Sequence, residues 1–290
     1  MTILVTGATG TVGRHLVGHL LAQGEKVRAL TRNPATAHLP EGVDVVGGDL
    51  TDTTTLAAAF AGVTAAHLIN FGGNYQVLEN GTEIVDLATA AGLGRVTVLN
   101  GWQEGTLEPA VRTGTLEWTF LNPFQFMSNC LTDWSEPLRT SGVVREPYGD
   151  RKSPPIHESD IAAVAAAILT QDGHHGQTYH LTGPEVLTAR DMVGILGEAT
   201  DRPLRFEELT PEQVRQEWVV NGNRPQLSFF SILDESGMSE AEKVDMLLHL
   251  FGTPLDDDFA LTDTVQQVTG RPPRSFAQWA AEHADHFQPG

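Results

Sequence analysis

The chain has 290 residues, which is enough for one large domain or for a domain with a smaller second one. Hydrophobic residues make up 40% and charged residues 19%, so the composition excludes a disordered chain. The formal net charge of -19 argues against nucleic acid and anionic membranes as partners, because both repel an acidic surface. The single cysteine, Cys130, excludes an intrachain disulfide, and neither a charged leader nor an apolar run of membrane-spanning length is found. We therefore expect a globular cytoplasmic protein.

Residues 3–21 have the pattern of a short buried strand, a glycine-rich turn and an amphipathic helix. Gly7 permits a tight turn, Gly10 lets the backbone approach a pyrophosphate, and Gly13 lets the helix pack against the strand. Free N–H groups at the start of the helix favour the negative charge of phosphates. An ordinary glycine turn is the alternative, but the position at the start of a βαβ unit favours a dinucleotide site. The predicted cofactor contacts are Gly7, Thr9, Gly10, Thr11, Val12 and Gly13.

The second predicted strand, residues 26–30, is followed by Arg32. An NAD-specific site usually has an acidic residue here, about 20 residues after the glycines, to accept from the ribose 2′-hydroxyl. A guanidinium instead suits a 2′-phosphate through paired, charge-assisted hydrogen bonds. We therefore predict NADP(H) in preference to NAD(H), with Arg14 as a second source of positive charge. A solvated surface arginine is the alternative for Arg32.

The third predicted strand, residues 43–46, leads to Asp49 and Leu50. They follow the end of a strand, at the edge where open α/β sheets bind ligands. Asp49 is predicted to accept from the adenine amino group while the backbone of Leu50 contacts the ring. Alternatively, Asp49 or Asp52 caps the helix predicted over residues 53–60.

Strands and helices continue to alternate further along the chain. Strands are predicted at residues 65–70, 95–99 and 118–121, and helices at residues 76–91 and 108–113. This alternation predicts an α/β fold with a doubly wound parallel sheet of the Rossmann type. Further cofactor contacts are predicted where the fourth and fifth strands end, at Asn70, Phe71, Gly72 and Asn100.

The substrate pocket is predicted at the same edge of the sheet, because apolar and amide side chains follow the fifth and sixth strands. Ordinary core packing is the alternative for each of the apolar ones. The predicted pocket residues are Trp102, Gln103, Phe124, Phe126 and Met127.

The pattern changes near residue 206, where helical periodicity becomes dominant. Before it, a helix over residues 161–169, a strand over residues 179–183 and a helix capped by Thr188 are predicted. We expect residues 1–205 to form the dinucleotide-binding domain, with pocket-forming insertions near residues 123–155. Residues 206–290 are expected to form a small, mainly helical substrate or cap region.

Several of these motifs together resemble the NmrA-like family of atypical short-chain dehydrogenases/reductases. They are residues 5–13, 31–34, 48–52, 155–162 and the tail over residues 269–279. The resemblance covers nearly the whole chain. It implies a Rossmann fold with a small C-terminal substrate domain, and NADP(H) binding. The family contains quinone reductases, other reductases and regulators that bind the cofactor without known turnover.

The usual catalytic groups of short-chain dehydrogenases, a serine and a Tyr-x-x-x-Lys pair after the fifth strand, are absent from residues 99–120. Tyr148 and Lys152 have that spacing, but neighbouring Pro147, Gly149 and Pro154 predict a loop, in which the two side chains would not lie one helical turn apart.

Any catalysis must therefore depend on other groups. Asn100 and Gln103 are placed to hold a carbonyl oxygen, and His157 and Tyr148 are the nearest proton donors; a histidine that only hydrogen-bonds the cap is the alternative for His157. His174 and His175 indicate a surface turn and no metal site.

Three functions follow in order of preference. The first is an NADPH-dependent reductase of a quinone, an enone or a similar small conjugated carbonyl, since hydride transfer to such an acceptor needs mainly proximity and orientation. The second is an NADP(H)-binding redox sensor without turnover that regulates a partner protein. The third is a non-redox cyclase or isomerase on the same fold. A small-molecule substrate is expected in the enzymatic cases, and a homodimer is compatible with all three.

Overall fold

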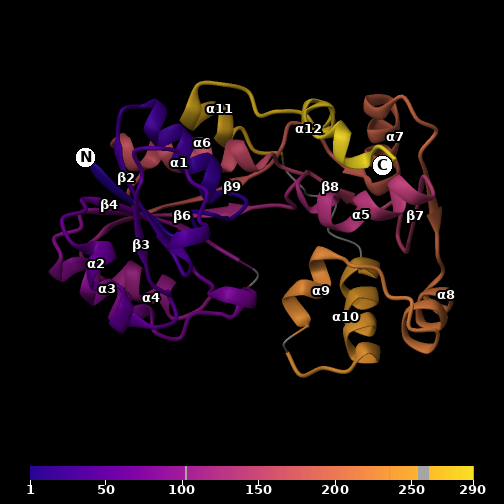
Figure 1. Ribbon diagram of the computed structural model, residues 1–290, viewed down its shortest axis with the longest axis horizontal. Helices are drawn as coiled ribbons and strands as arrows, with labels where there is room; N and C mark the ends of the chain where they lie inside the picture. The colour runs from indigo at the N-terminus through magenta and orange to yellow at the C-terminus, as the bar shows by residue number, and fades with distance from the viewer. Residues whose placement is uncertain (102, 235, 254–260, 290) are drawn as a thin grey trace. The chain divides into compact units, whose positions relative to one another are not determined.

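The computed structural model describes residues 1–101, 103–234, 236–253 and 261–289 (Figure 1). The chain forms two compact units. The first unit consists of Met1–Pro123, Glu158–Leu181 and Asp263–Pro272, and the second of Phe124–His157, Thr182–Thr262 and Pro273–Gly290. The two units are therefore not separated by a single boundary at residue 205, as the sequence predicts. Residues 124–157 and 182–205 belong to the second unit, where they pack with later helices.

A seven-stranded parallel sheet forms the centre of the first unit, in the order β3-β2-β1-β4-β5-β6-β9. This order confirms the predicted Rossmann-type sheet, in which the strand order reverses between β1 and β4. The strands are β1 (Thr2–Val5), β2 (Lys26–Thr31), β3 (Asp44–Gly47), β4 (Ala65–Ile69), β5 (Arg95–Leu99), β6 (Glu117–Pro123) and β9 (Gln177–Leu181).

Helices cover both faces of this sheet (Figure 1). The helices on one face are α1 (Gly13–Ala22), α6 (Glu158–Thr170) and α11 (Thr264–Thr269). Those on the other face are α2 (Ala57–Phe60), α3 (Gly81–Ala90) and α4 (Leu107–Thr113). Fully buried Leu68, Val98 and Phe120 join the second set of helices to the strands. The central strands β1, β4 and β5 are buried on both faces, which explains why most of their residues are apolar.

Two of the predicted helices are shorter in the structure. Residues 53–60 form a 3₁₀ turn, η2 (Thr53–Thr55), followed by α2. The helix predicted from residue 76 begins at Gly81, because the preceding residues turn back on themselves: the N–H of Gly72 donates to the carbonyl of Gln76 at 2.7 Å. The 3₁₀ turn η3 (Gly73–Tyr75) lies inside this return. A third 3₁₀ turn, η1 (Pro34–Thr36), follows β2.

The second unit combines helices with two short strand pairs, in which β7 is parallel to β11 and β8 is antiparallel to β10. Trp134, Met192, Phe276 and Trp279 are in its main core. Its elements are α5 (Asn129–Thr140), β7 (Val143–Glu146), β8 (Lys152–Ser153), β10 (Leu187–Thr188), α7 (Ala189–Thr200), β11 (Arg205–Glu208), α8 (Pro211–Val214), the π-helix η4 (Arg215–Val220), α9 (Ser228–Leu233), α10 (Glu240–Gly252), α12 (Phe276–Glu282) and the 3₁₀ helix η5 (Ala284–Phe287).

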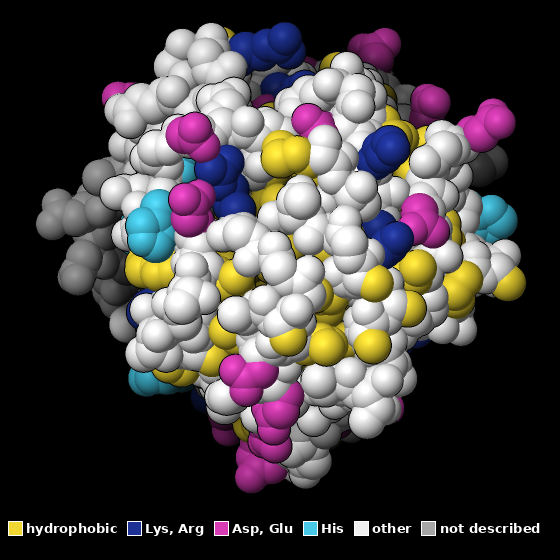
Figure 2. All heavy atoms as spheres, turned by 90° about the vertical axis from the view of Figure 1, so that its left-hand side faces the viewer, with side chains coloured by type: hydrophobic (Ala, Val, Ile, Leu, Met, Phe, Trp, Pro, Cys, Tyr) yellow, Lys and Arg dark blue, Asp and Glu magenta, His cyan; other side chains and the backbone are white. Residues whose placement is uncertain are grey.

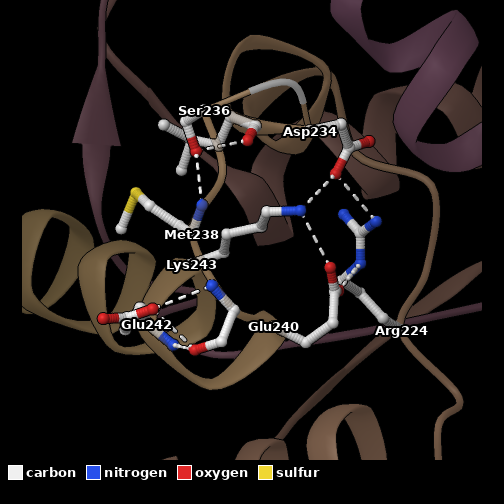
Figure 3. Close-up of polar contacts among 9 residues, drawn as sticks. Arg224, Asp234, Ser236, Met238, Glu240, Glu242 and Lys243 are labelled. Atoms are coloured by element: carbon white, nitrogen blue, oxygen red, sulfur yellow. Dashed lines mark hydrogen bonds and ion pairs between the residues drawn. The ribbon is translucent and has the colours of Figure 1, made fainter.

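An ion-pair network connects the end of α9 with the start of α10 (Figure 3). The ammonium of Lys243 lies 3.2 Å from the carboxylate of Asp234 and 2.9 Å from that of Glu240. Arg224 pairs with the same two carboxylates. The aliphatic stem of Lys243 is buried, while its ammonium reaches two carboxylates. The residue therefore contributes both apolar packing and ion pairs to this part of the second unit.

Candidate functional site

The glycine turn after β1 has the geometry of a pyrophosphate cradle. Gly7 has a φ of +60°, in the left-handed region, and its carbonyl accepts from the N–H of Gly10 at 2.9 Å. A Cβ at Gly13 would overlap the carbonyl oxygen of Gly7, so only glycine allows α1 to approach the strand this closely. The structure thus gives Gly7 and Gly13 the backbone tasks expected of them.

The start of α1 offers backbone donors and positive charge. The N–H groups of Thr11 and Val12 have no protein acceptor among the described residues, and the first turn has no acidic side chain. Arg14 donates to the carbonyls of Thr9 at 2.8 Å and Gly10 at 3.2 Å, so its guanidinium supports the turn. Free amides, a helix N-terminus and a nearby cation fit a dinucleotide pyrophosphate.

Arg32 is exposed and has no carboxylate partner within the described part of the chain. Its guanidinium lies against Gly73, where a Cβ would overlap Nη1. A Cβ at Gly72 would overlap a methyl group of Thr51 in the same way. The segments that follow β2, β3 and β4 therefore come together at Gly72 and Gly73, where any side chain would overlap a neighbouring segment. An unpaired guanidinium at this meeting point fits the 2′-phosphate of NADP(H).

The two aspartates after β3 serve local turns. The carboxylate of Asp49 accepts from the N–H of Thr51 at 3.0 Å and from its hydroxyl at 2.9 Å. Asp52 caps η2 by accepting from the N–H of Thr54 at 3.1 Å, which confirms the capping alternative for this residue. Leu50 is buried. The adenine contacts expected of Asp49 and Leu50 remain predictions.

Asn70 connects three segments at the end of β4. Its Oδ1 accepts from the N–H of Gly101 at 2.7 Å, and its Nδ2 donates to the carbonyl of Gln103 at 3.0 Å and to the carboxylate of Glu108. Glu108 is fully buried, and it also accepts from the N–H of Gly105 at 3.0 Å. Asn70 therefore positions the loop after β5, and its predicted contact with the cofactor remains untested.

Phe71 directly follows this anchor and supports the same loop. Its ring stacks on Tyr75 with centroids 5.4 Å apart, and it lies so close to Gly101 that a Cβ there would be 2.9 Å from the ring. The ring of Phe71 therefore packs against Tyr75 in its own loop and against Gly101 in the loop after β5.

A polar hollow of about 230 Å³ opens at the carboxyl ends of β5 and β6. Asn100 Nδ2 donates to Asn122 Oδ1 at 2.8 Å, and Arg112 pairs with Glu104. Ligands of open α/β sheets bind at this edge. The residues that line the hollow are Asn100, Gly101, Gln103, Glu104, Glu108, Arg112 and Asn122.

Sequence reasoning placed Asn100 and Gln103 here but missed the remaining lining residues. Asn122 could have been found, because the register of β5 on β6 pairs Leu99 with Leu121 and so places the two asparagines side by side. Glu108 carries no such signal, since it reads as an ordinary acidic residue in the first turn of a helix.

The predicted pocket residues after β6 belong to the second unit. Met127 is fully buried in the core of that unit, which is the packing alternative, while Phe124 and Phe126 are partly buried. Trp102 lies outside the described residues.

The candidate proton donors also lie in the second unit. The hydroxyl of Tyr148 donates to the carbonyl of Leu248 at 3.0 Å. His157 is buried, and its Nε2 lies 3.3 Å from the carboxylate of Glu282. Tyr148 begins a turn and exposed Lys152 is in strand β8, so the two residues do not share a helix, as predicted, although Lys152 is in a strand and not in a loop.

Other histidines do not form a site. His67 is buried in β4, where burial lowers its pKa to about 4, and Nδ1 lies 2.8 Å from the hydroxyl of Thr97. It is therefore a neutral core histidine at physiological pH. His174 lies 2.9 Å from the hydroxyl of Tyr179. Within the described ranges, no group of three or more metal-ligating side chains is placed to hold an ion.

The surface is mixed in charge where it can be seen. On the face shown in Figure 2, the coloured basic side chains lie as separate groups, several of them beside acidic ones. None of the helices in the described part of the chain is long and apolar enough to cross a membrane.

Comparison with known proteins identifies the family. The model of the NmrA-like family matches residues 1–98. A (4-alkanoyl-5-oxo-2,5-dihydrofuran-3-yl)methyl phosphate reductase of Streptomyces griseus is 36% identical over 99% of this chain and 99% of its own. An NAD(P)H azoreductase of Xenophilus azovorans is 33% identical over 98% of this chain and 99% of its own.

A solved structure shares the fold over almost the whole length. The NADPH complex of the quinone oxidoreductase QOR2 of Escherichia coli superposes with a TM-score of 0.73, at 22% identity, over 97% of this chain and 99% of that one. The glycine cradle, the free amides and the sheet order described above agree with a cofactor-binding fold of this kind. The chain therefore belongs to the NmrA-like family, as an NAD(P)H-dependent oxidoreductase.

Proposed function

We propose that this enzyme uses NADPH to reduce a small conjugated acceptor such as a quinone or an enone. The observation that carries the proposal is the polar hollow at the ends of β5 and β6, which offers amide groups and no Tyr–Lys pair. The names of two relatives support it, because they describe the reduction of a dihydrofuranone with an alkanoyl group and of azo compounds. We propose the second unit as the substrate region and the cytoplasm as the location.

Bound NADPH supplies the hydride in this proposal. The turn at Gly7 and the N–H groups of Thr11 and Val12 hold the pyrophosphate, and Arg32 holds the 2′-phosphate. The exposed amide side chain of Gln103 in the hollow orients the acceptor. A quinone or enone spreads the negative charge that develops, so positioning supplies most of the catalysis and a dedicated tyrosine is dispensable.

Three residues are the candidates for contact with the reacting atoms. Asn100 lines the hollow and is proposed to act there. His157 and Tyr148 are proposed proton donors, each of which would first have to release its present partner, Glu282 or the carbonyl of Leu248. Replacement of either by Phe should lower the rate for an enone, which needs a proton on carbon, more than the rate for a quinone.

The experiment is a turnover assay on the purified protein. We expect the nicotinamide absorbance of NADPH to fall when members of a quinone and enone panel are added, and to fall more slowly with NADH. A panel without any acceptor-dependent loss of NADPH would overturn the proposed reaction.

A redox sensor is the second candidate, favoured by the engagement of the Tyr148 hydroxyl and the burial of His157. It predicts different affinities for NADP⁺ and NADPH by calorimetry, together with a regulatory protein partner and no turnover. Equal affinities and no partner would remove it. A cyclase or isomerase would instead convert substrate without consuming cofactor. Light scattering tests the proposed homodimer.

A further inference from the structure

Two asparagines form a side-chain pair at the carboxyl edge of the sheet. Asn100 follows β5 and Asn122 lies in β6, and the N–H of Asn100 donates to the carbonyl of Leu121 at 3.0 Å, which extends the strand pairing to this point. Asn100 Nδ2 donates to Asn122 Oδ1 at 2.8 Å. Both side chains are partly buried and line the polar hollow.

The pair leaves one acceptor and one donor without protein partners. Asn100 Oδ1 is buried and accepts no hydrogen bond from the described residues, and no acceptor among them takes the hydrogens of Asn122 Nδ2. A buried amide oxygen without a partner is unfavourable, because it has lost its hydration and gained no hydrogen bond in return. Rotating both amides by 180° would exchange the roles of the two residues, but it would again leave one acceptor and one donor free.

The other polar side chains of the hollow are either exposed, as Gln103 is, or already have partners. Glu108 accepts from Asn70 and from the N–H of Gly105, and Arg112 pairs with Glu104 and lies over the ring of Phe120 at 4.7 Å. Among the described residues that line the hollow, Asn100 Oδ1 is therefore the buried side-chain atom that lacks a hydrogen bond, and Asn122 presents a free donor beside it.

We propose that Asn100 and Asn122 together dock the primary carboxamide of the cofactor's nicotinamide ring. A primary carboxamide presents an N–H donor and a carbonyl acceptor on neighbouring atoms, which complements the free acceptor and the free donor of the pair. A quinone or a ketone presents acceptors only and would leave Asn100 Oδ1 unpaired. In a dinucleotide fold the nicotinamide half lies beyond the change of strand order, on the side of β4, β5 and β6.

The two-point contact would hold the carboxamide and so orient the nicotinamide ring at the sheet edge. It makes the asparagines positioning residues for the hydride donor, with no part in proton transfer. This inference rests on the proposed use of NADPH and adds the residues that orient its reactive half.

The test compares three ligands by calorimetry on the full chain. They are NADP⁺, its 3-acetylpyridine analogue, which has an acetyl group in place of the carboxamide, and 2′-phospho-ADP-ribose, which has no nicotinamide. In the unaltered protein we expect the analogue to bind about tenfold more weakly than NADP⁺, since it cannot donate to Asn100 Oδ1. Asn100→Leu should reduce this ratio to about one, because it removes the acceptor for the carboxamide N–H. Asn122→Leu should weaken NADP⁺ and the analogue alike and keep the ratio, because both ligands retain the carbonyl that accepts from Asn122 Nδ2.

Binding of 2′-phospho-ADP-ribose should be equal in all these proteins, which shows that the variants fold. Thr119→Val is the matched control, because Thr119 is in β6 like Asn122 but does not line the hollow. The change removes a hydrogen bond to the carbonyl of His174 and should keep the tenfold ratio. Equal binding of NADP⁺ and the analogue by the unaltered protein would overturn the inference. It would also be overturned by a tenfold ratio that survives Asn100→Leu, or by an Asn122→Leu variant that binds NADP⁺ as tightly as the unaltered protein. If NADP⁺ binds with the expected ratio but no acceptor is reduced, only the proposed reaction fails.

Discussion

Asn70, at the end of β4, donates a hydrogen bond to the carboxylate of Glu108 on α4, and both side chains are buried. The same amide accepts from the N–H of Gly101 at 2.7 Å. One side chain thus holds the loop after β5 from two sides, and this loop contributes Gly101, Gln103 and Glu104 to the polar hollow. The shape of the hollow depends on a pair of residues that are 38 positions apart.

Asn70→Asp should be strongly destabilising, because it places a second carboxylate against buried Glu108. We expect a loss of about 3 kcal/mol in the free energy of unfolding, measured with urea, and weaker binding of NADP⁺. Adding Glu108→Gln should recover part of the loss, since the glutamine amide can donate to the new aspartate. Asn33→Asp, at an exposed position, is the control for the added charge in the urea measurement alone, because Asn33 adjoins Arg32. Equal losses in Asn70→Asp and Asn33→Asp would contradict the role of the pair.

The features predicted correctly from sequence are those that only a few residue types can form. Gly7, Gly10 and Gly13 identify the cofactor turn because a backbone with φ > 0 and a close helix approach both exclude a Cβ. The alternation of apolar strands with helices identifies the parallel sheet, because each parallel connection needs a crossover.

The parts missed are contacts between segments far apart in the chain. Asn70 and Glu108 are ordinary residues in sequence, and their burial together follows only from the packing of α4. The predicted start of α3 is too early, since Val77 fits the apolar pattern of the helix but pairs with Phe71 instead, and the N–H of Leu78 donates to the carbonyl of Asn70. Asn122 could have been predicted, because the register of β5 on β6 places it beside Asn100.

Gly13→Ala should abolish cofactor binding, because the new methyl group would overlap the carbonyl of Gly7 and push α1 away from β1. The expected results are a lower melting temperature and no detectable binding of NADP⁺. Gly18→Ala on the same helix is the matched control, since its Cβ would meet no atom within 4 Å. That change should raise the stability by about 0.5–1 kcal/mol without affecting NADP⁺ binding. Similar losses in both variants would argue against the cradle geometry.

Arg32→Ala should weaken NADPH binding while leaving NADH almost unchanged. The loss of a charge-assisted contact to the 2′-phosphate predicts a rise of about tenfold to one hundredfold in the KM for NADPH. Arg139→Ala is the control, because Arg139 is an exposed arginine on α5 in the second unit and the change in net charge is the same. A parallel rise in the KM for NADH would instead show that Arg32 supports the adenosine half without reading the phosphate.

A pair of acidic side chains in the second unit should make stability depend on pH. Burial raises the pKa of Asp133 to about 7, although hydrogen bonds from Ser228 oppose the rise. Burial, with a smaller contribution from the negative charge of Asp133, raises the pKa of Glu146 to about 8. The Nε1–H of Trp134 donates to Glu146 at 2.8 Å. Because both pKa values are higher in the folded chain than in the unfolded one, the folded state keeps protons that the unfolded state releases.

The stability supplied by these two protons is complete below the unfolded pKa values, near 4, and is lost as the pH rises through about 7 and 8. Glu146→Gln keeps an acceptor for Trp134 but cannot ionise, so urea unfolding should show a smaller decline between pH 5 and about 8 and a more stable protein at the upper end. Asp191→Asn tests the opposite sign, since hydrogen bonds from Thr188 lower the pKa of Asp191 and its contribution is lost as the pH falls. A Glu146→Gln variant whose stability declines as steeply as that of the unaltered protein would show that the carboxylate is not the group that titrates.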